Sequence, residues 1–329
     1  MKDILNKLID YKPLDKDEAY KVLIEIGRGQ VNHSQIAVFL SIYMMRSITV
    51  NELSGFREAL LDLCKQIDFG GIQTIDMCGT GGDGKNTFNI STISAFVTAG
   101  AGVKVTKHGN YGVSSKCGSS NVMEYLGYRF TNNQDILNRQ LEKTNICILH
   151  APLFHPAMKE VAPIRRELGM KTFFNMLGPL VNPCKPTHQS VGVFNLELAR
   201  LYKYLFENSS TKYSIVHALD GYDECSLTGD LKLITNKTDQ VINPEILGFD
   251  KVNPTSIYGG ESIDEAGKIF IDILSGNYTE SQKNVVVANS AIAISTYKEI
   301  PLEEAKGLAI ESLESRNALN TLKNLLTIN

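Results

Sequence analysis

The chain has 329 residues, of which 43 % are hydrophobic, so it can bury a full core in one large domain or two. Its formal net charge of -3 excludes the basic field that nucleic-acid binding needs. The six cysteines contain no Cys-x-x-Cys pair, and no run of about 18 apolar residues occurs, so we expect reduced thiols, no zinc knuckle and no membrane span. Without a signal-peptide pattern, the expected location is cytoplasmic.

Residues 1–70 are predicted to form four helices. Apolar residues recur at helical spacing, and two capping-box patterns, Asp15 with Glu18 and Thr49 with Glu52, predict the starts of the second and fourth helices. Nothing in this region has catalytic spacing. We therefore expect a helical packing module through which the chain forms a homodimer.

From Gly70 onward, short β-branched runs alternate with helical segments, which predicts an α/β fold with a mostly parallel central sheet and flanking helices. The expected strands are 72–77, 103–106, 146–149, 191–194, 213–218 and 231–235. Helices are expected again after Ser262, Thr279 and Pro301. Ligands of such sheets bind outside the carboxyl ends of the strands, and the polar residues 79–84, 107–108, 150 and 220–224 are expected just after strands.

The glycine-rich loop 79–84 indicates phosphate binding. Glycine lets backbone N–H groups approach an anion closely, and the following helix adds free N–H donors at its start. Ser91 and Thr92 suit that helix start, where their hydroxyls can serve a ligand or a metal, and Lys107 can supply a positive charge. For the loop taken alone, a purely structural turn is the alternative.

Two familiar nucleotide motifs fit this loop only in part. Gly79, Gly81 and Gly84 satisfy G-x-G-x-x-G, but the region about 20 residues on is basic around Lys107, where a dinucleotide site needs an acidic residue. The P-loop pattern fails at Asn86, because it requires a hydroxyl for Mg²⁺ there. Neither a dinucleotide site nor a P-loop is therefore predicted.

Taken together, the polar segments resemble those of anthranilate phosphoribosyltransferases, which share their fold with pyrimidine nucleoside phosphorylases. The matching segments follow the family's order and span most of the chain: 78–83 (CGTGGD), 88–92 (FNIST), 107–110 (KHGN), 165–169 (RRELG), 174–183 (FNMLGPLVNP) and 220–224 (DGYDE). One departure is Asn121, where the family usually has Asp in support of the serine-rich loop 114–120. The resemblance implies a helical domain, 1–70 joined by part of 156–186, and an α/β domain, 71–329.

The resemblance implies transfer of the 5-phosphoribosyl group from phosphoribosyl pyrophosphate to the amine of anthranilate, giving N-(5-phosphoribosyl)anthranilate and pyrophosphate in tryptophan biosynthesis. The implied phosphoribosyl pyrophosphate site is Gly79, Gly82, Asp83, Thr87, Asn89, Ser91, Thr92, Lys107 and Ser119. The implied anthranilate site is Gly79, His108, Asn110 and Arg165. Ser91, Asp223 and Glu224 are the implied ligands of two Mg²⁺ per monomer. An aryl amine is already nucleophilic, so we expect no general base, and catalysis by positioning and leaving-group stabilisation.

Each assignment has a plainer alternative. Asp223 and Glu224 can form an acidic turn, although adjacent carboxylates also suit Mg²⁺. Arg165 can be an ordinary surface arginine rather than a fork for a carboxylate. Three further histidines and cysteines are assigned to packing or pocket lining: His150, His155 and Cys117. His108 can likewise be a satisfied buried histidine.

Three other functions stay open. A pyrimidine nucleoside phosphorylase usually carries a further C-terminal domain, for which 329 residues leave little room. A phosphoribosyltransferase for another aromatic amine is harder to exclude. Against a nucleotide-sensing or DNA-binding relative of the fold stand the negative net charge and the Asp223–Glu224 pair.

Overall fold

The computed structural model describes residues 1–112 and 116–328, which form two compact units. Unit 1 consists of Met1–Ile67 and Ala151–Lys185, and unit 2 consists of Asp68–His150 and Pro186–Asn329. Ser114 and Ser115 of the predicted serine loop lie outside the described residues. The chain therefore leaves unit 1, builds the first half of unit 2, and returns.

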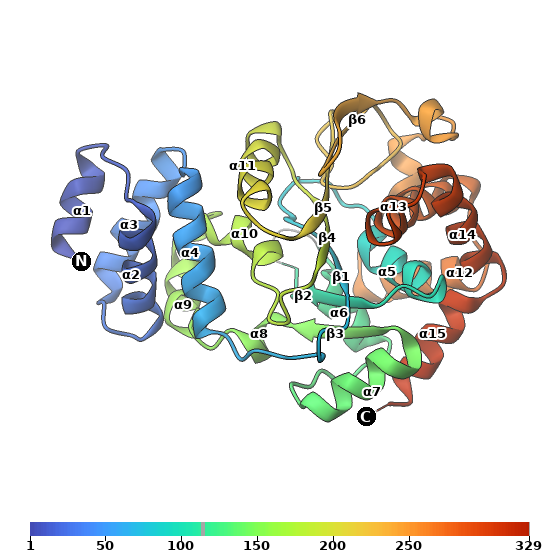
Figure 1. The fold of residues 1–329 in the computed structure, drawn as a ribbon, viewed down its shortest axis with the longest axis horizontal. Helices are drawn as coiled ribbons and strands as arrows, with labels where there is room; N and C mark the ends of the chain where they lie inside the picture. The colour runs from blue at the N-terminus through green and yellow to red at the C-terminus, as the bar shows by residue number, and fades with distance from the viewer. Residues whose placement is uncertain (113–115, 329) are drawn as a thin grey trace. The chain divides into compact units, whose positions relative to one another are not determined.

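Unit 1 is entirely helical in its described residues. The four helices expected before residue 70 are present, and both predicted capping boxes are formed, at Asp15 with Glu18 and at Thr49 with Glu52. Its helices are α1 (Lys2–Ile9), α2 (Lys16–Gly27), α3 (His33–Met45), α4 (Val50–Leu63), α8 (Ala151–Phe154), α9 (Met158–Leu168), α10 (Phe174–Leu177) and the 3₁₀ turn η1 (Gly178–Leu180). Figure 1 shows α9 and α10 beside α2 and α4.

An aromatic cluster joins the two stretches of unit 1. Phe173, from the returning stretch, stacks on Phe56 of α4 with ring centroids 4.7 Å apart. It also meets Phe39 edge-on at 5.9 Å and Tyr43 at 5.1 Å, both from α3. Aromatic rings bury large areas and prefer such stacked and edge contacts. The core of unit 1 is therefore complete only when both stretches are present.

Glu52 lies fully buried at the start of α4 and is held by donors from several segments of unit 1. Its carboxylate accepts hydrogen bonds from Leu14 N (3.0 Å), Tyr43 Oη (2.9 Å) and Thr49 N (2.9 Å), and it pairs with the Arg46 guanidinium. Burial alone would raise the pKa of Glu52, but these donors outweigh it and lower the pKa. Glu52 is therefore a charged tie between α3, α4 and the segment before α2.

Unit 2 is built on one sheet, which has seven strands in the described residues. They are β1 (Ile75–Gly79), β2 (Val105–Gly109), β3 (Ile146–His150), β4 (His188–Gly192), β5 (Lys212–Ala218), β6 (Leu231–Thr235) and β7 (Asp239–Ile242). Their order is β3-β2-β1-β4-β5-β6-β7, parallel from β3 to β5 and antiparallel beyond. Strand order reverses between β1 and β4, which makes their carboxyl ends the place for a ligand.

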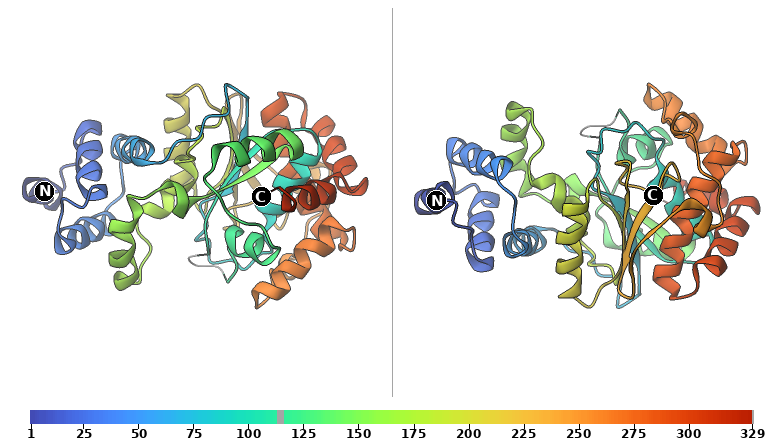
Figure 2. Two further views of the ribbon diagram at one scale, coloured as in Figure 1. Left: turned by 90° about the horizontal axis from the view of Figure 1, so that it is seen from below. Right: turned by 90° about the horizontal axis from the view of Figure 1, so that it is seen from above.

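Helices cover both faces of this sheet, as Figures 1 and 2 show. One side carries α5 (Ile90–Gly100), α12 (Ile263–Leu274), α13 (Glu280–Lys298), α14 (Leu302–Glu314) and α15 (Asn317–Leu326), and α11 (Leu196–Glu207) lies on the other. The remaining helices are α6 (Ser119–Tyr125), α7 (Gln134–Thr144) and the 3₁₀ turns η2 (Pro244–Leu247) and η3 (Pro254–Ile257). The α/β fold expected from the alternating pattern is confirmed.

Four details differ from the prediction. β1 begins at Ile75 rather than 72, and β4 is His188–Gly192 rather than 191–194, because polar His188 and Gln189 open it. Lys107 and His108 were expected just after a strand, but both lie within β2 and pair with Ile148 and Leu149 of β3. The hydrophilic strand β7 was missed, since it is an exposed edge strand without an apolar run. No described helix has the length and apolar character to cross a membrane.

Candidate active site

The loop between β1 and α5 begins with glycines in left-handed backbone conformation, with φ of +63° at Gly81 and +80° at Gly82. Such angles are open to glycine at little strain. The far end of the loop is fixed by main-chain hydrogen bonds, from Phe88 N to Ile257 O (3.1 Å) and from Gly259 N to Asn86 O (2.8 Å). Thr87, a predicted ligand, pairs there with Tyr258. The glycine loop is thus anchored at its end and turns sharply at its start.

Asp223, in the loop after β5, packs directly against this turn. A Cβ placed on Gly79 or on Gly192 would collide with Asp223, so the close approach requires glycine at the ends of both β1 and β4. The N–H of Gly81 donates to Asp223 Oδ2 at 2.6 Å. The glycine loop and the acidic loop, far apart in sequence, therefore meet where the strand order reverses, between β1 and β4.

Three carboxylates gather here: Asp83, Asp223 and Glu224. Burial raises the pKa of Asp223, and the charge of Asp83 raises it further. Burial and the charge of Asp223 likewise raise the pKa of Glu224, against the opposing effects of Lys107 and a hydrogen bond from Ser91. The surroundings of both carboxyls therefore disfavour their ionised forms.

This donor set fits a hard divalent cation. It offers only oxygen atoms, from Asp223, Glu224 and the Ser91 hydroxyl. The pKa values of both carboxyls are raised, and a bound cation would favour their ionised forms. In the described ranges, no group of three or more His, Cys, Asp or Glu residues is arranged to hold a metal unaided. Mg²⁺ commonly takes a few protein oxygens and completes its shell with water and phosphate, so the residues are compatible with it.

Lys107 and Asp76 replace backbone pairing where β1 and β2 separate. Among the described residues, Ile75 and Val105 are the one pair at which β1 and β2 are in register. Beyond this point Asp76 Oδ1 accepts from His108 N at 3.0 Å, and Lys107 Nζ donates to the carbonyl of Met77. Lys107 is only 2 % exposed. Its charge is directed toward the carboxyl end of β1 and lowers the pKa of Glu224.

The predicted acceptor side follows β2. Asn110 is exposed, and its carbonyl accepts from Ser120 N (3.1 Å) and Ser119 Oγ (3.3 Å), which ties it to the start of α6. Asn121 Oδ1 accepts from Gly112 N (2.9 Å) and Gly118 N (3.0 Å), so one oxygen supports both sides of the loop. Because an amide oxygen suffices for both bonds, Asn121 can serve where the family usually has Asp.

The predicted residues of α5 occupy its N-terminus. Asn89 precedes the helix, and its Nδ2 donates to Cys117 O at 3.0 Å rather than capping α5. Ser91 and Thr92 lie in the first turn, where the Thr92 side chain is buried and Ser91 is half-buried. Asn89 therefore links the glycine loop to the segment before α6.

His150 was expected just after a strand but is the last residue of β3, in unit 2. Its Nδ1 lies 2.8 Å from Ser120 Oγ, and its ring stacks on Phe130 at 4.3 Å. Burial lowers its pKa. These contacts favour the packing role expected for it.

Arg165 lies on α9 and is described within unit 1. Its Nη2 donates to Asn175 Oδ1 at 3.1 Å, and its guanidinium lies 5.5 Å from the Phe174 ring centroid. Burial lowers its pKa, and Nε is buried without a hydrogen-bond partner among the described residues. No carboxylate of the described residues forms an ion pair with it, so this guanidinium is suited to an anion from outside the chain.

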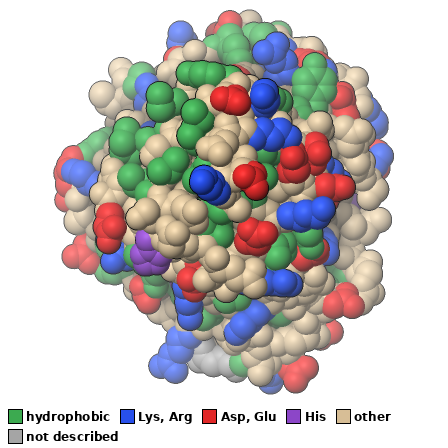
Figure 3. Space-filling view, turned by 90° about the vertical axis from the view of Figure 1, so that its left-hand side faces the viewer, with side chains coloured by type: hydrophobic (Ala, Val, Ile, Leu, Met, Phe, Trp, Pro, Cys, Tyr) green, Lys and Arg blue, Asp and Glu red, His purple; other side chains and the backbone are tan. Residues whose placement is uncertain are grey.

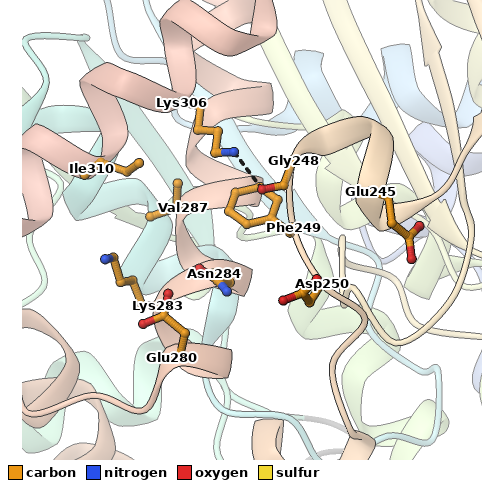
Figure 4. A pocket seen from close by; sticks show the side chains of 10 residues that line it. All are labelled: Glu245, Gly248, Phe249, Asp250, Glu280, Lys283, Asn284, Val287, Lys306 and Ile310. Atoms are coloured by element: carbon orange, nitrogen blue, oxygen red, sulfur yellow. Dashed lines mark hydrogen bonds between the residues drawn. The ribbon is translucent and has the colours of Figure 1, made fainter.

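A separate pocket of about 450 Å³ lies in unit 2, and Figure 4 shows its lining. Phe249, Val287 and Ile310 supply apolar surface, while Lys306 bonds to Gly248 O at 2.8 Å. None of the predicted site residues lines it. The candidate active site is therefore defined by the converging loops and not by this pocket.

Two residues of the site were not predicted, although each left a sequence signal. Asp76 is an acidic residue inside an apolar strand, and Gly192 interrupts a β-branched run. Each is a polar or small residue at a position where a buried core usually has an apolar one. Such exceptions commonly mark positions that are set by a site.

This combination of helical unit, parallel sheet and converging glycine and acidic loops is that of a glycosyl transferase, and the chain belongs to the glycosyl transferase family. Residues 71–322 match its a/b domain and residues 2–64 its helical bundle domain. Within the family, the chain is similar to anthranilate phosphoribosyltransferases. The one of Flavobacterium psychrophilum is 59 % identical over 99 % of this chain and 98 % of its own length, and that of Cytophaga hutchinsonii is 55 % identical over 98 % and 99 %.

Solved structures agree. Anthranilate phosphoribosyltransferase from Thermus thermophilus superposes with a TM-score of 0.92 at 30 % identity, covering 98 % of each chain. The Saccharomyces cerevisiae enzyme in complex with PRPP (phosphoribosyl pyrophosphate) and Mg gives 0.90 at 26 % identity, covering 98 % of this chain and 95 % of that one. The resemblance inferred from the sequence motifs is confirmed.

Proposed function

We propose that the chain transfers the 5-phosphoribosyl group from phosphoribosyl pyrophosphate to the amine of anthranilate, as a pentosyltransferase of tryptophan biosynthesis. The observation that carries the proposal is the meeting of the glycine loop with Asp223 at the ends of β1 and β4. It joins phosphate-binding backbone to an acidic loop that suits a divalent cation. The full-length similarity to anthranilate phosphoribosyltransferases supports the choice of substrates.

The donor substrate binds through the glycine loop and the first turn of α5. Backbone N–H groups around Gly79 and Gly82 receive phosphate oxygens, with polar side chains of the same loops around them. The remaining proposed contacts are Asp83, Thr87, Asn89, Ser91, Thr92, Lys107 and Ser119. Lys107 stands in β2 behind the loop and contributes its charge to this end of the sheet.

Mg²⁺ is part of the proposal, held by Ser91, Asp223 and Glu224, with two ions per monomer. When bound, it neutralises charge on the pyrophosphate leaving group. The chain's own residues hold the carboxylates in place, through the N–H of Gly81 at Asp223 and through a hydrogen bond from Ser91 at Glu224. The Mg in the yeast enzyme's complex with PRPP supports this choice of ion.

Anthranilate is held by Gly79, His108, Asn110 and Arg165. The Arg165 fork binds the carboxylate, because the guanidinium is desolvated and has no acidic partner of its own in the described chain. The amine is neutral at pH 7. Its nitrogen forms the bond to C1 of the ribose as the bond from C1 to the pyrophosphate oxygen breaks, and the extra N–H proton is then released to water. Positioning and charge stabilisation then supply the catalysis, without a general base.

A homodimer through the helical unit completes the proposal, with a cytoplasmic location. Unit 1 exposes large apolar side chains, including Ile9 and Tyr11 (75 % exposed) at α1, and Val38 and Met45 (80 %) on α3. Figure 3 shows hydrophobic side chains gathered between charged ones on this side of the molecule. Large contiguous exposed apolar patches mark protein interfaces, and we assign these side chains to the proposed dimer contact.

The division into domains belongs to the same proposal. A helical domain of residues 1–70 with part of 156–186 and an α/β domain of residues 71–329 are supported by the two compact units and by the family matches at 2–64 and 71–322.

The test is to follow anthranilate fluorescence on mixing purified protein with phosphoribosyl pyrophosphate and Mg²⁺. Anthranilate fluorescence should fall only when all components are present, and mass spectrometry should identify phosphoribosylanthranilate. Replacing anthranilate with its 3- or 4-amino isomer is the control, because those amines place the carboxylate elsewhere. Faster consumption of another aromatic amine would contradict the assignment of the acceptor.

A further inference from the structure

Asn289 lies in the buried middle of α13, a helix of unit 2. Most of its buried neighbours on the helix are apolar, among them Val285, Val287 and Ala291. An amide buried in such surroundings is unfavourable unless its polar atoms are hydrogen-bonded. The partners of Asn289 therefore indicate why an asparagine stands there.

The amide of Asn289 is bonded at both ends, chiefly to one residue of the acidic loop. Cys225 N donates to Asn289 Oδ1 at 3.0 Å, and Asn289 Nδ2 donates to Cys225 O at 2.9 Å. The second Nδ2 hydrogen bond goes to Val285 O in the same helix, at 2.8 Å. Asn289 thus pairs with both the N–H and the C=O of Cys225, as a residue of a neighbouring strand would.

Cys225 directly follows Glu224, and its N–H lies in the peptide plane that contains the Cα of Glu224. Fixing that N–H fixes this plane and with it the Cα of Glu224, the atom from which its side chain leaves the backbone. We propose that Asn289 is a positioning residue that holds Glu224 in place for the divalent cation and the pyrophosphate. This inference rests on the proposed function, since it assigns Asn289 a part in the same site.

The rest of the loop shows why such a tie is needed. Leu227, two residues beyond Cys225, adopts a left-handed conformation with φ of +57°, which is unfavourable for leucine and persists only where the surroundings impose it. Thr228 Oγ1 donates to Asp220 Oδ2 at 2.5 Å and closes the loop at its base. Gly79 and Gly192 pack closely against Asp223, the residue before Glu224. Asn289 holds the backbone of Cys225, the residue after Glu224, with its side chain.

Two variants and one matched control test the proposal. Asn289→Leu keeps a similar side-chain volume and removes all three hydrogen bonds of the Asn289 amide. Asn289→Asp keeps an acceptor for Cys225 N but places a carboxylate oxygen against the Cys225 carbonyl oxygen. Asn284→Leu is the control, because it makes the same exchange on the same helix at a half-buried position outside the acidic loop. Far-UV circular dichroism and thermal melting establish which variants are folded.

Binding is measured by calorimetric titration of phosphoribosyl pyrophosphate at several Mg²⁺ concentrations, and transfer by anthranilate fluorescence. Both Asn289 variants should weaken Mg²⁺-dependent binding at least about 10-fold, as loss of an outer partner of a metal ligand typically does. The KM for anthranilate should change less than about 2-fold. A general loss of structure would weaken the binding of both substrates, whereas loss of a positioning residue should weaken only the Mg²⁺-dependent binding of phosphoribosyl pyrophosphate.

Unchanged Mg²⁺-dependent binding in a folded Asn289 variant would overturn the proposal, as would equal effects from Asn284→Leu. If neither variant folds, hydrogen exchange on the unaltered protein decides, because the Cys225 amide must be protected before any ligand is added. Rapid exchange at Cys225 would also overturn it. Failure of the unaltered protein to bind phosphoribosyl pyrophosphate with Mg²⁺ would instead reject the proposed function itself.

Discussion

The N–H of Gly81 donates a hydrogen bond of 2.6 Å to Oδ2 of Asp223, a residue 142 positions later in the chain. The phosphate-binding turn and the acidic loop are therefore one structure. A change in the carboxylate must alter the glycine loop as well, because Gly81 adopts a conformation that the bond helps to hold. Effects at the cation site and at the phosphate site should be coupled.

Asp223→Asn and Glu224→Gln should each lower kcat, on the order of 100-fold, and shift the Mg²⁺ requirement to higher concentration. The side chains lie in a loop at the carboxyl ends of the strands, so the fold should persist by circular dichroism. The double variant should lose less than the sum of the two free-energy losses if both act through one site. Full activity of the double variant at low Mg²⁺ would show that Asp223 and Glu224 form an acidic turn and do not bind the metal.

Lys107→Ala should weaken phosphoribosyl pyrophosphate binding more than anthranilate binding in calorimetric titrations. Lys107 lowers the pKa of Glu224, so its removal lets that carboxyl hold its proton to higher pH. The acid limb of the kcat/KM profile should accordingly shift toward higher pH. Lys107→Met is the companion variant, since it retains the buried stem without the charge. Equal weakening of both substrates would contradict the assignment.

Arg165→Ala should raise the KM for anthranilate about 30-fold and leave that for phosphoribosyl pyrophosphate nearly unchanged. The estimate corresponds to about 2 kcal/mol for a lost charged bidentate contact. Asn175→Ala should have a smaller effect in the same direction, about 5-fold, because Asn175 Oδ1 only orients the guanidinium. The neighbouring Arg166→Ala is the control. An unaltered anthranilate KM in Arg165→Ala would remove this residue from the acceptor site.

Glu52→Gln should destabilise unit 1 by about 3 kcal/mol, since it leaves Arg46 partly buried without its counter-charge. The folded pKa of Glu52 is lowered, so its contribution is present above the unfolded pKa of about 4.3 and is lost as pH falls through the folded value. Urea denaturation at pH 7 and pH 3, followed by far-UV circular dichroism, should show the variant and the original converging at acid pH. Lys16→Ala, which breaks the exposed pair with Glu58, should change stability by less than about 1 kcal/mol.

Much of this fold was predictable because its local signals agree with its tertiary contacts. The capping pairs Asp15 with Glu18 and Thr49 with Glu52 predicted helix starts that the structure confirms, and β-branched runs located the central strands. The end of β2 was misplaced because Lys107 and His108 are polar residues of a strand. Their polar groups are satisfied by Asp76 and Met77, which a linear pattern does not show.

The site was predictable as a set of loops but not as a set of partners. Glycines and adjacent carboxylates indicate their chemistry in sequence, whereas Asp83 beside Asp223 or Asn289 beside Cys225 depends on how distant segments meet. The same limit applied to Glu52, which was read as half of a capping box. Its bonds to Leu14 and Tyr43 arise only in the packed unit.

The discontinuity of unit 1 has a consequence for synthesis on the ribosome. Phe39 and Phe56 emerge early, but Phe173, which stacks on Phe56, follows only after the first half of unit 2 has been made. At about 10 residues per second, the stretch from residue 67 to 185 takes on the order of 10 s. During that interval the aromatic core of unit 1 lacks Phe173, and part of its apolar surface is exposed to water. We therefore expect chaperones to bind the nascent helices until residues 151–185 have been made.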